Sequence, residues 1–421
     1  MNWLAQFLHY AQKVFELPNL LRRVRDGRPD PQIPLRSVNL CLLLGVVTRV
    51  ASYLDLAQQT TRKRWRRLCH LAQAISHDTF GYVTERMQPD DWRLNQAEVV
   101  KTLKRNKALE SCKIKGLLFL SVDGNEHFHS RSRCCQRCGQ RQLEETDDQG
   151  QKHPVIEYYH RYVMAQINGP KLNVLLDVEP ILPGEEECAA ALRLLGRIRR
   201  IYGARFIDGV SFDAWYAQGP FLRAIKKLGW FWVVVLKRQD LDVYQEARQL
   251  SQGQPPDAVF EDQQRKRQVQ LWEVKDLAFS REYGQAVRVV RSEERWTEKR
   301  VRGGRKEQKP RCSQWVWATG AELDGYAAEV VYQAGHRRWG IENKAFNELT
   351  QGYHLEHCYH HDPTSMLVMM LILVFGFTLF TAFALHSQLV RLGELTLKAL
   401  AHELDLALEQ DLPWDQWFHS G

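Results

Sequence analysis

The sequence predicts an α/β protein in which a mixed sheet follows a helical N-terminal region and is interrupted by a β-rich insertion. Residues 1–110 have a helical, basic pattern. From Lys115 onward, short apolar runs alternate with helical segments, as in a sheet with helical crossovers. Residues 258–320 are polar and contain short strand-like pieces. With 421 residues and 44% hydrophobic composition, the chain can bury a large core divided into two or three units.

The N-terminal region is expected to consist of helices. Met1 to Leu17 has the pattern of an amphipathic helix and not of a signal sequence. A proline-rich break over 28–34 separates it from a second helix that begins at Ser37. Ser76 is expected to cap a further helix, because its hydroxyl can accept a hydrogen bond from a backbone amide of the first turn.

Two basic runs in this region suit contacts to phosphate. Residues 62–67 place five cations around one tryptophan, and residues 101–107 add four more. We expect Arg64 and Arg66 of the first run to contact DNA. A solvated helix face explains either run equally well when it is taken alone.

The middle of the chain predicts a sheet with an antiparallel part followed by a parallel part. Strands are expected over 116–122, 158–167, 172–178, 204–212 and 230–237, with helices over 185–202 and 219–228. The early strands are joined by short connections, which favours an antiparallel meander, whereas the later strands alternate with helices as parallel strands do. An RNase H-like domain requires this order. Lys237, at the end of the last strand, is a further candidate for DNA contact.

The insertion is expected to lie inside this sheet. Its strand-like pieces are residues 269–274, 286–290 and 314–319. The run Met366–Leu385 that follows is uncharged and long enough to span a bilayer. It contains two threonines, has no second comparable segment and leads into a charged amphipathic tail. A fully buried core helix, which is apolar on all sides, is therefore the favoured interpretation.

Three acidic residues stand in contexts that suit metal binding. Asp123 and Asp213 each close a short apolar run, and Glu342 lies in a helical segment much later in the chain. Side chains at the carboxyl ends of strands meet at one sheet edge. Hard divalent cations prefer carboxylate oxygens, and two cations about 4 Å apart assist phosphodiester displacement. Each acid taken alone is more often an ordinary structural carboxylate.

The segments around these acids carry a resemblance. SVDGNEHFHS, SFDAWYAQGPF and RRWGIENKAFNEL resemble, in this order, the three acidic motifs of DDE transposases from bacterial insertion sequences. Arg338 precedes Glu342 by four residues, as in the group with a Tyr-Arg-Glu-Lys signature, and the 129 residues after Asp213 leave room for the usual insertion. The signature Lys is missing after Glu342, and the signature Tyr falls at Gly335, with Tyr332 one turn earlier.

The resemblance implies a set of roles. Asp123, Asp213 and Glu342 would be catalytic and would bind two Mg²⁺ or Mn²⁺ ions, and Arg338 would clamp a phosphate beside them. Trp296, in a basic part of the insertion, would stack on a DNA base, with packing of the insertion's own core as the alternative.

The resemblance also implies partners and a division of the chain. The partners would be the element ends and target DNA, bound by a homodimer. The expected regions are a DNA-binding or dimerising region (1–110), the first part of the RNase H-like catalytic core (111–257), a β-rich insertion (258–325), and the catalytic helix with a buried helical tail (326–421).

A cysteine motif raises a separate expectation. Cys135 and Cys138 have the spacing of a zinc knuckle, but the sequence contains no second pair of this kind. Histidines would have to complete the site, and His129 and His160 are the candidates. A reduced, partly buried cysteine cluster in a loop is the alternative.

Charge and cysteine content agree with an intracellular DNA-binding enzyme. The net charge of +8 favours an anionic partner, and nine irregularly spaced cysteines fit a reducing cytosol. The leading prediction is a cut-and-paste transposase that binds inverted terminal repeats, in the cytoplasm and associated with the nucleoid. The alternatives are an inactive remnant that only binds DNA and a Mg²⁺-dependent nuclease without strand transfer.

Overall fold

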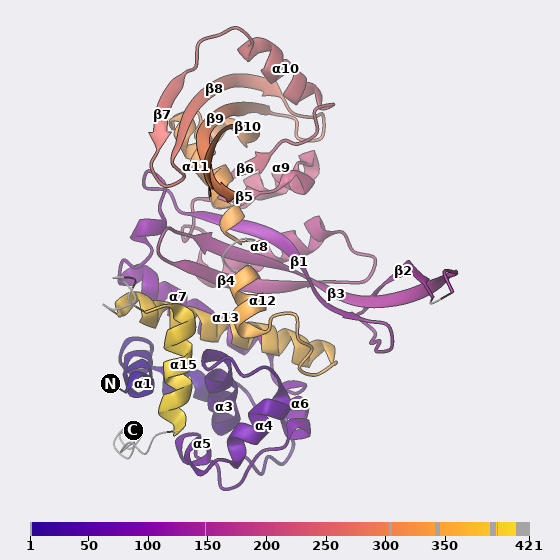
Figure 1. Cartoon of the computed structure of the whole chain (residues 1–421), viewed down its shortest axis with the longest axis vertical. Coiled ribbons are helices and arrows are strands. Elements are labelled where there is room, and N and C mark those ends of the chain that lie inside the picture. Colours follow the sequence, from indigo (N-terminus) through magenta and orange to yellow (C-terminus); the bar gives the residue numbers. More distant parts are fainter. Residues whose placement is uncertain are drawn as a thin grey trace. The chain divides into compact units, whose positions relative to one another are not determined.

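The chain forms two compact units. The computed structural model describes residues 2–147, 149–302, 305–341, 346–387, 393 and 395–409 (Figure 1). The first unit comprises Met1–Cys112, Gly124–Tyr202 and Glu342–Gly421, and the second comprises Lys113–Asp123 and Gly203–Ile341. Each unit collects segments that are far apart in sequence, whereas the predicted boundaries at 110, 257 and 325 follow the order of the chain.

The N-terminal part of the first unit is helical, as predicted. Its helices are α1 (Trp3–Phe15), α2 (Leu17–Arg23), α3 (Leu35–Val47), α4 (Tyr53–Thr61), α5 (Lys63–Leu68), α6 (His77–Thr84) and α7 (Pro89–Arg105), followed by the 3₁₀ turn η1 (Glu110–Cys112). The predicted cap is confirmed, since the Ser76 hydroxyl oxygen accepts a hydrogen bond from the Thr79 backbone amide at 3.2 Å.

Helix α13 (Pro363–His386) is the core of this unit. Of its most apolar window, 94% is buried, and it packs against α3, α7 and strand β4 (Asn173–Ile181). The Phe375 ring meets the Trp92 ring edge-on, with centroids 5.5 Å apart. A helix buried on all sides must be apolar all round, so the burial accounts for its composition. Helices α8 (Glu187–Tyr202), α12 (Asn347–Tyr353) and α15 (Leu397–Glu409) complete the described helices of this unit.

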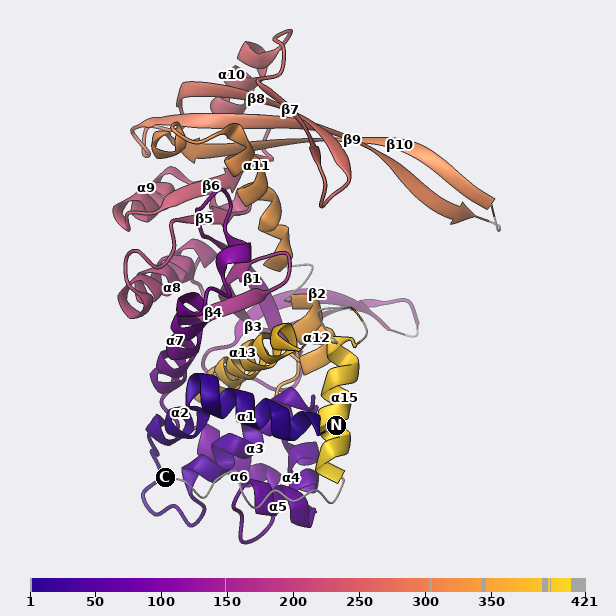
Figure 2. The ribbon, with the colours of Figure 1, turned by 90° about the vertical axis from the view of Figure 1, so that its left-hand side faces the viewer.

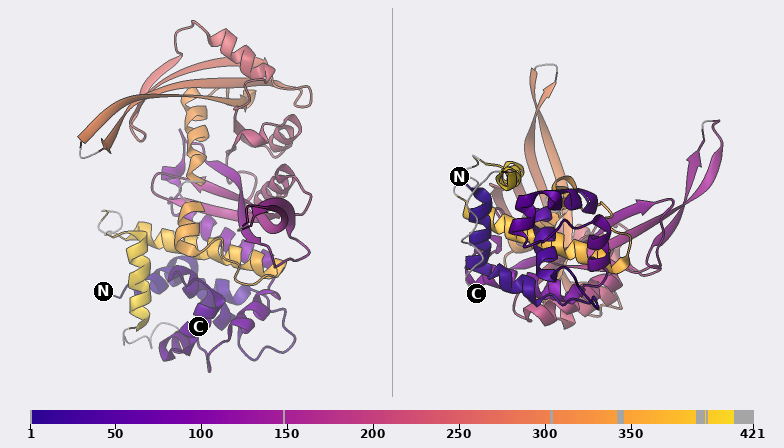
Figure 3. Two further views of the ribbon diagram at one scale, coloured as in Figure 1. Left: turned by 45° about the vertical axis from the view of Figure 1, so that its right-hand side comes forward. Right: turned by 90° about the horizontal axis from the view of Figure 1, so that it is seen from below.

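The strands of the first unit are antiparallel. Strand β3 (Lys152–Asn168) pairs with β2 (Gly139–Thr146) along its first half and with β4 along its second half. In the strand order, β3 lies between β2 and β1 (Phe119–Ser130). The β2–β3 hairpin extends away from the helices (Figure 3). The expected meander is confirmed by β3 and β4, whereas β2 was not expected.

The second unit contains the parallel part of the sheet and the insertion. Its strands are β1, β5 (Gly209–Phe212), β6 (Phe231–Val235), β7 (Ala258–Asp262), β8 (Arg267–Ala278), β9 (Ala286–Arg302) and β10 (Arg305–Gly320). Its helical elements are η2 (Ala214–Tyr216), α9 (Gly219–Lys227), α10 (Asp242–Ser251), η3 (Ala321–Leu323) and α11 (Ala328–Arg337).

Strand directions in the second unit follow the prediction. Strand β5 pairs in parallel with both β1 and β6, and the antiparallel series β7–β8–β9–β10 joins this sheet where β10 pairs with β6. The long β9–β10 hairpin extends beyond the other strands of its unit (Figure 2). The predicted fold class, a mixed RNase H-like sheet with a β-rich insertion and a helical N-terminal region, is confirmed.

Several expected strand boundaries are wrong: β3, β9 and β10 are longer than expected, β5 is shorter, and β1 differs most at the candidate site. Strand β1 does not end at Asp123 but continues to Ser130, with a half-buried and then partly exposed pattern. The apolar run stops at the first charged residue. A strand with one solvent-exposed face alternates polar and apolar side chains, so it can continue beyond that residue.

Candidate active site and candidate metal centre

The register of β1 and β5 relates Asp123 to Asp213. Ser121 lies opposite Ser211 in the parallel ladder, and their hydroxyl oxygens are 3.1 Å apart. Side chains two residues apart in a strand point to the same face, and neighbouring strands lie about 4.8 Å apart. The ladder pairs residues as far as Ser121 and Ser211; if the same register continued by two residues, Asp123 and Asp213 would lie opposite each other on the face of the two serines.

Asp213 is held at the end of β5 by the turn that follows it. The backbone remains extended at Asp213, with φ −78° and ψ 179°, and the residue caps η2. Its Oδ1 accepts a hydrogen bond of 2.9 Å from the Trp215 backbone amide. The Trp215 side chain is 62% exposed, which is unusual for a residue of this size. Trp215 is not among the predicted site residues, although its position two residues after a candidate acid is a signal in the sequence.

Arg338 reaches Asp123 from the end of α11. Helix α11 ends at Arg337 and Arg338 is its C-cap, so Arg338 does not lie within this helix. Its Nη1 donates to Asp123 Oδ2 at 3.0 Å, and its side chain is only 2% exposed. A buried guanidinium requires such a partner. Glu342, the third predicted acid, lies outside the described residues.

Two neighbouring acids have structural contacts. Asp208 Oδ2 accepts the Leu118 backbone amide at 2.7 Å and so ties the start of β5 to β1. Glu126 pairs with Arg141 in the first unit, with a nitrogen–oxygen distance of 2.8 Å. These contacts give both acids structural roles.

Helix α11 is fixed to the insertion by a buried polar network. Glu294 on β9 is fully buried and pairs with Arg265, Arg267 and His336. Burial by itself raises the pKa of Glu294, but the hydrogen bond from His336 and the arginine charges outweigh it and lower this pKa to about 2. Burial lowers the pKa of His336, so its neutral ring donates to the carboxylate.

Residues at the signature tyrosine position are part of this packing. A side chain at Gly335 would place its Cβ 2.1 Å from Trp317 Nε1, so the indole occupies the space that a tyrosine would need. The Tyr332 hydroxyl donates to Asp262 Oδ2 and accepts from Arg265 Nη1, each at 2.9 Å. Tyr332 therefore contributes two hydrogen bonds to the buried polar network around α11.

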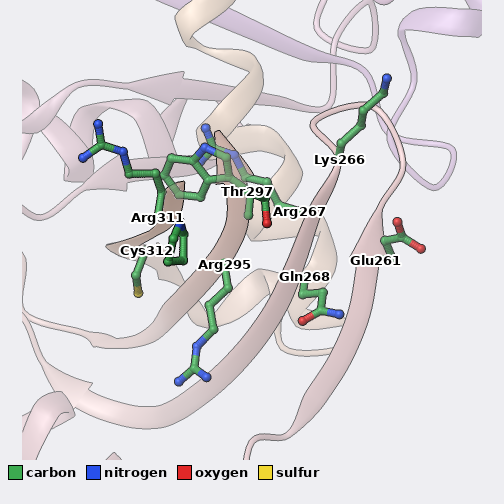
Figure 4. Close-up of a pocket in the computed structure, with 10 residues that line it drawn as sticks. Glu261, Lys266, Arg267, Gln268, Arg295, Thr297, Arg311 and Cys312 are labelled. Carbon is green, nitrogen blue, oxygen red and sulfur yellow. The ribbon is translucent and has the colours of Figure 1, made fainter. Parts of the chain in front are cut away.

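Trp296 lines a cationic pocket in the insertion (Figure 4). The cavity has a volume of about 490 Å³. Its lining residues are Glu261, Lys266, Arg267, Gln268, Arg295, Trp296, Thr297, Pro310, Arg311 and Cys312. The Arg267 guanidinium carbon lies 3.9 Å from the Trp296 ring centroid. One face of this half-buried ring therefore carries a cation.

The remaining predicted DNA contacts differ in their surroundings. Lys237 is exposed just beyond the end of β6. Arg64 and Arg66 lie on α5 and are half-buried on either side of the fully buried Trp65. Arg66 Nη1 donates to the Thr61 carbonyl at 2.6 Å, so its guanidinium caps the end of α4. Packing in the first unit therefore explains why some of the arginines in this basic run are present.

A second group of possible metal ligands lies in the first unit. One ligand atom from each of its members lies within 4.8 Å of every other: Cys135, Cys138, His160 and His361. His361 takes the place predicted for His129, whose ring lies instead 3.1 Å from both Glu126 and Arg141 and is half exposed. The predicted ligand set is therefore corrected at one position. Burial lowers the pKa of His160 to about 4, which keeps this imidazole neutral.

The comparisons with known proteins identify a domain. Residues 169–378 match the family model described as a transposase DDE domain. The chain therefore carries a DDE transposase domain, and the match includes the positions of Asp213 and Glu342 but begins after Asp123.

Among solved structures, the chain is similar to the piggyBac transposase synaptic complex with hairpin DNA, determined by cryo-EM. The identity is 13%, the TM-score is 0.43, and the similarity covers 97% of this chain and 80% of the other. The comparison with curated proteins gave no match.

Proposed function

We propose that this protein is a DNA transposase that binds the inverted terminal repeats of an insertion sequence and catalyses metal-dependent cleavage and strand transfer by cut-and-paste. The observation that carries the proposal is the parallel β1–β5 pairing, in which Ser121 lies opposite Ser211, two residues before Asp123 and Asp213, together with the match of residues 169–378 to a DDE transposase domain. Paired carboxylates on adjacent strands suit hard divalent cations.

The proposed catalytic residues are Asp123, Asp213 and Glu342. They would hold two Mg²⁺ or Mn²⁺ ions, which when bound activate the attacking oxygen and stabilise the leaving oxygen in phosphodiester displacement. The donor set fits these ions, since all three residues offer carboxylate oxygens. The Trp215 amide orients Asp213 by occupying its Oδ1.

Arg338 has two tasks in this proposal. Its hydrogen bond to Asp123 fixes the orientation of that carboxylate and offsets part of its charge. A guanidinium has five donors, so Arg338 can also bind a phosphate oxygen beside the acids. Replacement by lysine would keep the charge but lose the fork of donors.

DNA would bind through the cationic surfaces of both units. Trp296 in its pocket is the proposed contact for a displaced base, and Lys237, Arg64 and Arg66 are the proposed contacts for the backbone. Transposition requires two element ends to be processed together, so a homodimer on DNA is the proposed active form. The enzyme would act on chromosomal DNA in the cytoplasm, associated with the nucleoid.

A strand-transfer assay tests the proposal. Purified protein is incubated with Mg²⁺ or Mn²⁺, labelled DNA carrying the element ends, and target DNA. Asp123→Ala and Asp213→Ala should each lower the rate by on the order of 10³-fold, since several kcal/mol of transition-state stabilisation depend on the cations. Glu126→Gln, a change on the same strand as Asp123, is the control and should retain activity.

The same assay separates the alternatives. A remnant that only binds DNA would shift the labelled ends in a gel without cutting them. A nuclease without strand transfer would hydrolyse DNA with Mg²⁺ but would not join 3′ ends to the target. Strand transfer by Asp123→Ala at the wild-type rate would refute the proposed catalytic site.

A further inference from the structure

We propose that the first unit contains a structural zinc site with four protein ligands: Cys135, Cys138, His160 and His361. The inference does not depend on the proposed function, because none of the four ligands is a proposed catalytic residue and the metal content is measured without DNA.

The distances within the cluster are those of a tetrahedral zinc site. Zn–S bonds of about 2.3 Å and Zn–N bonds of about 2.0 Å imply about 3.8 Å between two sulfurs and about 3.5 Å between sulfur and nitrogen. The Cys135 and Cys138 sulfurs are 3.7 Å apart. Cys138 Sγ lies 3.2 Å from His160 Nε2 and 3.4 Å from His361 Nε2. Cys135 Sγ lies 3.4 Å from His160 Nε2, and the remaining distances, from His361 to Cys135 and to His160, are within 4.8 Å, so a single ion can contact all four atoms once His361 adjusts.

The fold itself brings the first three ligands together. Gly139 pairs with Tyr159 in the antiparallel β2–β3 ladder, so the preceding Cys138 lies opposite His160. The turn between β1 and β2 places Cys135 beside Cys138 and His160. Its backbone amide donates to Cys138 Sγ at 3.3 Å, and the Cys138 amide donates to the Cys135 carbonyl at 3.1 Å.

The fourth ligand comes from the connection between α12 and α13. His361 packs its ring against Phe128 of β1, with centroids 4.9 Å apart. The next residue, Asp362, caps α13 by accepting the Thr364 and Ser365 backbone amides, both at 2.9 Å. A metal bound to His361 would therefore fix the start of the core helix to β2, to β3 and to the part of β1 that follows Asp123, all of which belong to the first unit.

The chemistry of the cluster favours zinc over the alternatives. A Cys135–Cys138 disulfide requires a sulfur–sulfur distance of about 2.05 Å, much shorter than the 3.7 Å observed. Two thiolates and two imidazoles in a tetrahedral set are typical ligands of structural zinc, and a set closed by four protein ligands is structural and not catalytic. Cys138 and His160 are each 5% exposed, so the cluster is not an accidental grouping of surface side chains.

Metal analysis of the full-length protein tests the proposal. Untagged protein is purified without chelators, and its zinc content is measured by inductively coupled plasma mass spectrometry. We expect one zinc ion per chain in the wild type and loss of most of it in His361→Ala. His361→Cys should restore zinc, because a third thiolate can take the fourth position. Cys134→Ser, which alters the exposed cysteine beside the cluster, should leave zinc content unchanged.

Two further measurements guard against variants that fail to fold. Circular dichroism shows whether His361→Ala keeps the wild-type helical content. Wild-type protein in which Co²⁺ replaces zinc should show the intense visible bands of a tetrahedral site and a thiolate charge-transfer band. Wild type that contains no zinc and takes up no Co²⁺ overturns the proposal. So does a Cys135–Cys138 disulfide in the freshly purified protein, or full zinc content in a folded His361→Ala variant.

Discussion

The buried carboxylate of Glu294 should be essential for the stability of the second unit. The side chain is fully buried against two arginines and His336. Glu294→Gln keeps the shape of the side chain but removes its charge. The partly buried guanidinium groups of Arg265 and Arg267 then lose the carboxylate with which they pair. Removal of one partner from a buried ion pair costs about 3–5 kcal/mol.

The pKa of Glu294 gives a similar magnitude. Burial raises this pKa, but the hydrogen bond from His336 and the arginine charges lower it from 4.5 to about 2. That difference corresponds to roughly 3 kcal/mol of stability. Because the folded pKa lies below the unfolded one, this stability is fully present above pH 4.5 and is lost as the pH falls through about 2. The difference between wild type and variant should shrink over the same range.

Urea denaturation followed by tryptophan fluorescence measures the effect. Trp315 and Trp317 report on this region, because their ring centroids lie 5.5 and 4.9 Å from that of His336. The matched control is Glu293→Gln on the same strand, whose side chain pairs with the exposed Arg295 and should matter by less than about 1 kcal/mol. Equal unfolding free energies for Glu294→Gln and Glu293→Gln would refute the reasoning.

Two further substitutions test packing, one in each unit. Gly335→Ala places a Cβ 2.1 Å from the Trp317 indole and should lower the free energy of unfolding by about 1–3 kcal/mol in urea denaturation. The control is Gly325→Ala, which has no atom within 4 Å of its Cβ and should leave the free energy of unfolding unchanged. Equal effects of the two substitutions would contradict the close contact. Phe375→Ala removes the ring that packs on Trp92 in the centre of α13 and should cost about 3–5 kcal/mol. Wild-type protein that resists carbonate extraction from membranes would argue against α13 as a core helix.

The candidate acids could be found from the sequence because their local contexts are informative. Asp123 and Asp213 each follow a short apolar run, and such runs form buried strands. The end of β1 could not be placed in the same way. Polar and apolar residues alternate beyond Asp123, and whether such a segment remains a strand depends on the partner that pairs with it.

Long-range partners could not be found from the sequence. His361 joins the cysteine cluster from 223 residues beyond Cys138, and Arg338 reaches Asp123 across 215 residues. His129, near the cysteines in sequence, was the natural candidate for a ligand, but it lies among Glu126 and Arg141 instead. Closeness in sequence is therefore a poor guide to the fourth ligand of a metal site.

The sequence by itself determined the fold class and the general order of helices and strands, and it supplied the three candidate acids and two of the cysteine ligands. These properties depend on periodicity, turn residues and motif spacing, which are local. The tertiary structure alone decided that β1 and β5 pair with Ser121 opposite Ser211, that Arg338 is held by Asp123, and that His361 lies with the cysteine cluster. Each of these depends on chain segments that only folding brings together, so no local pattern encodes them.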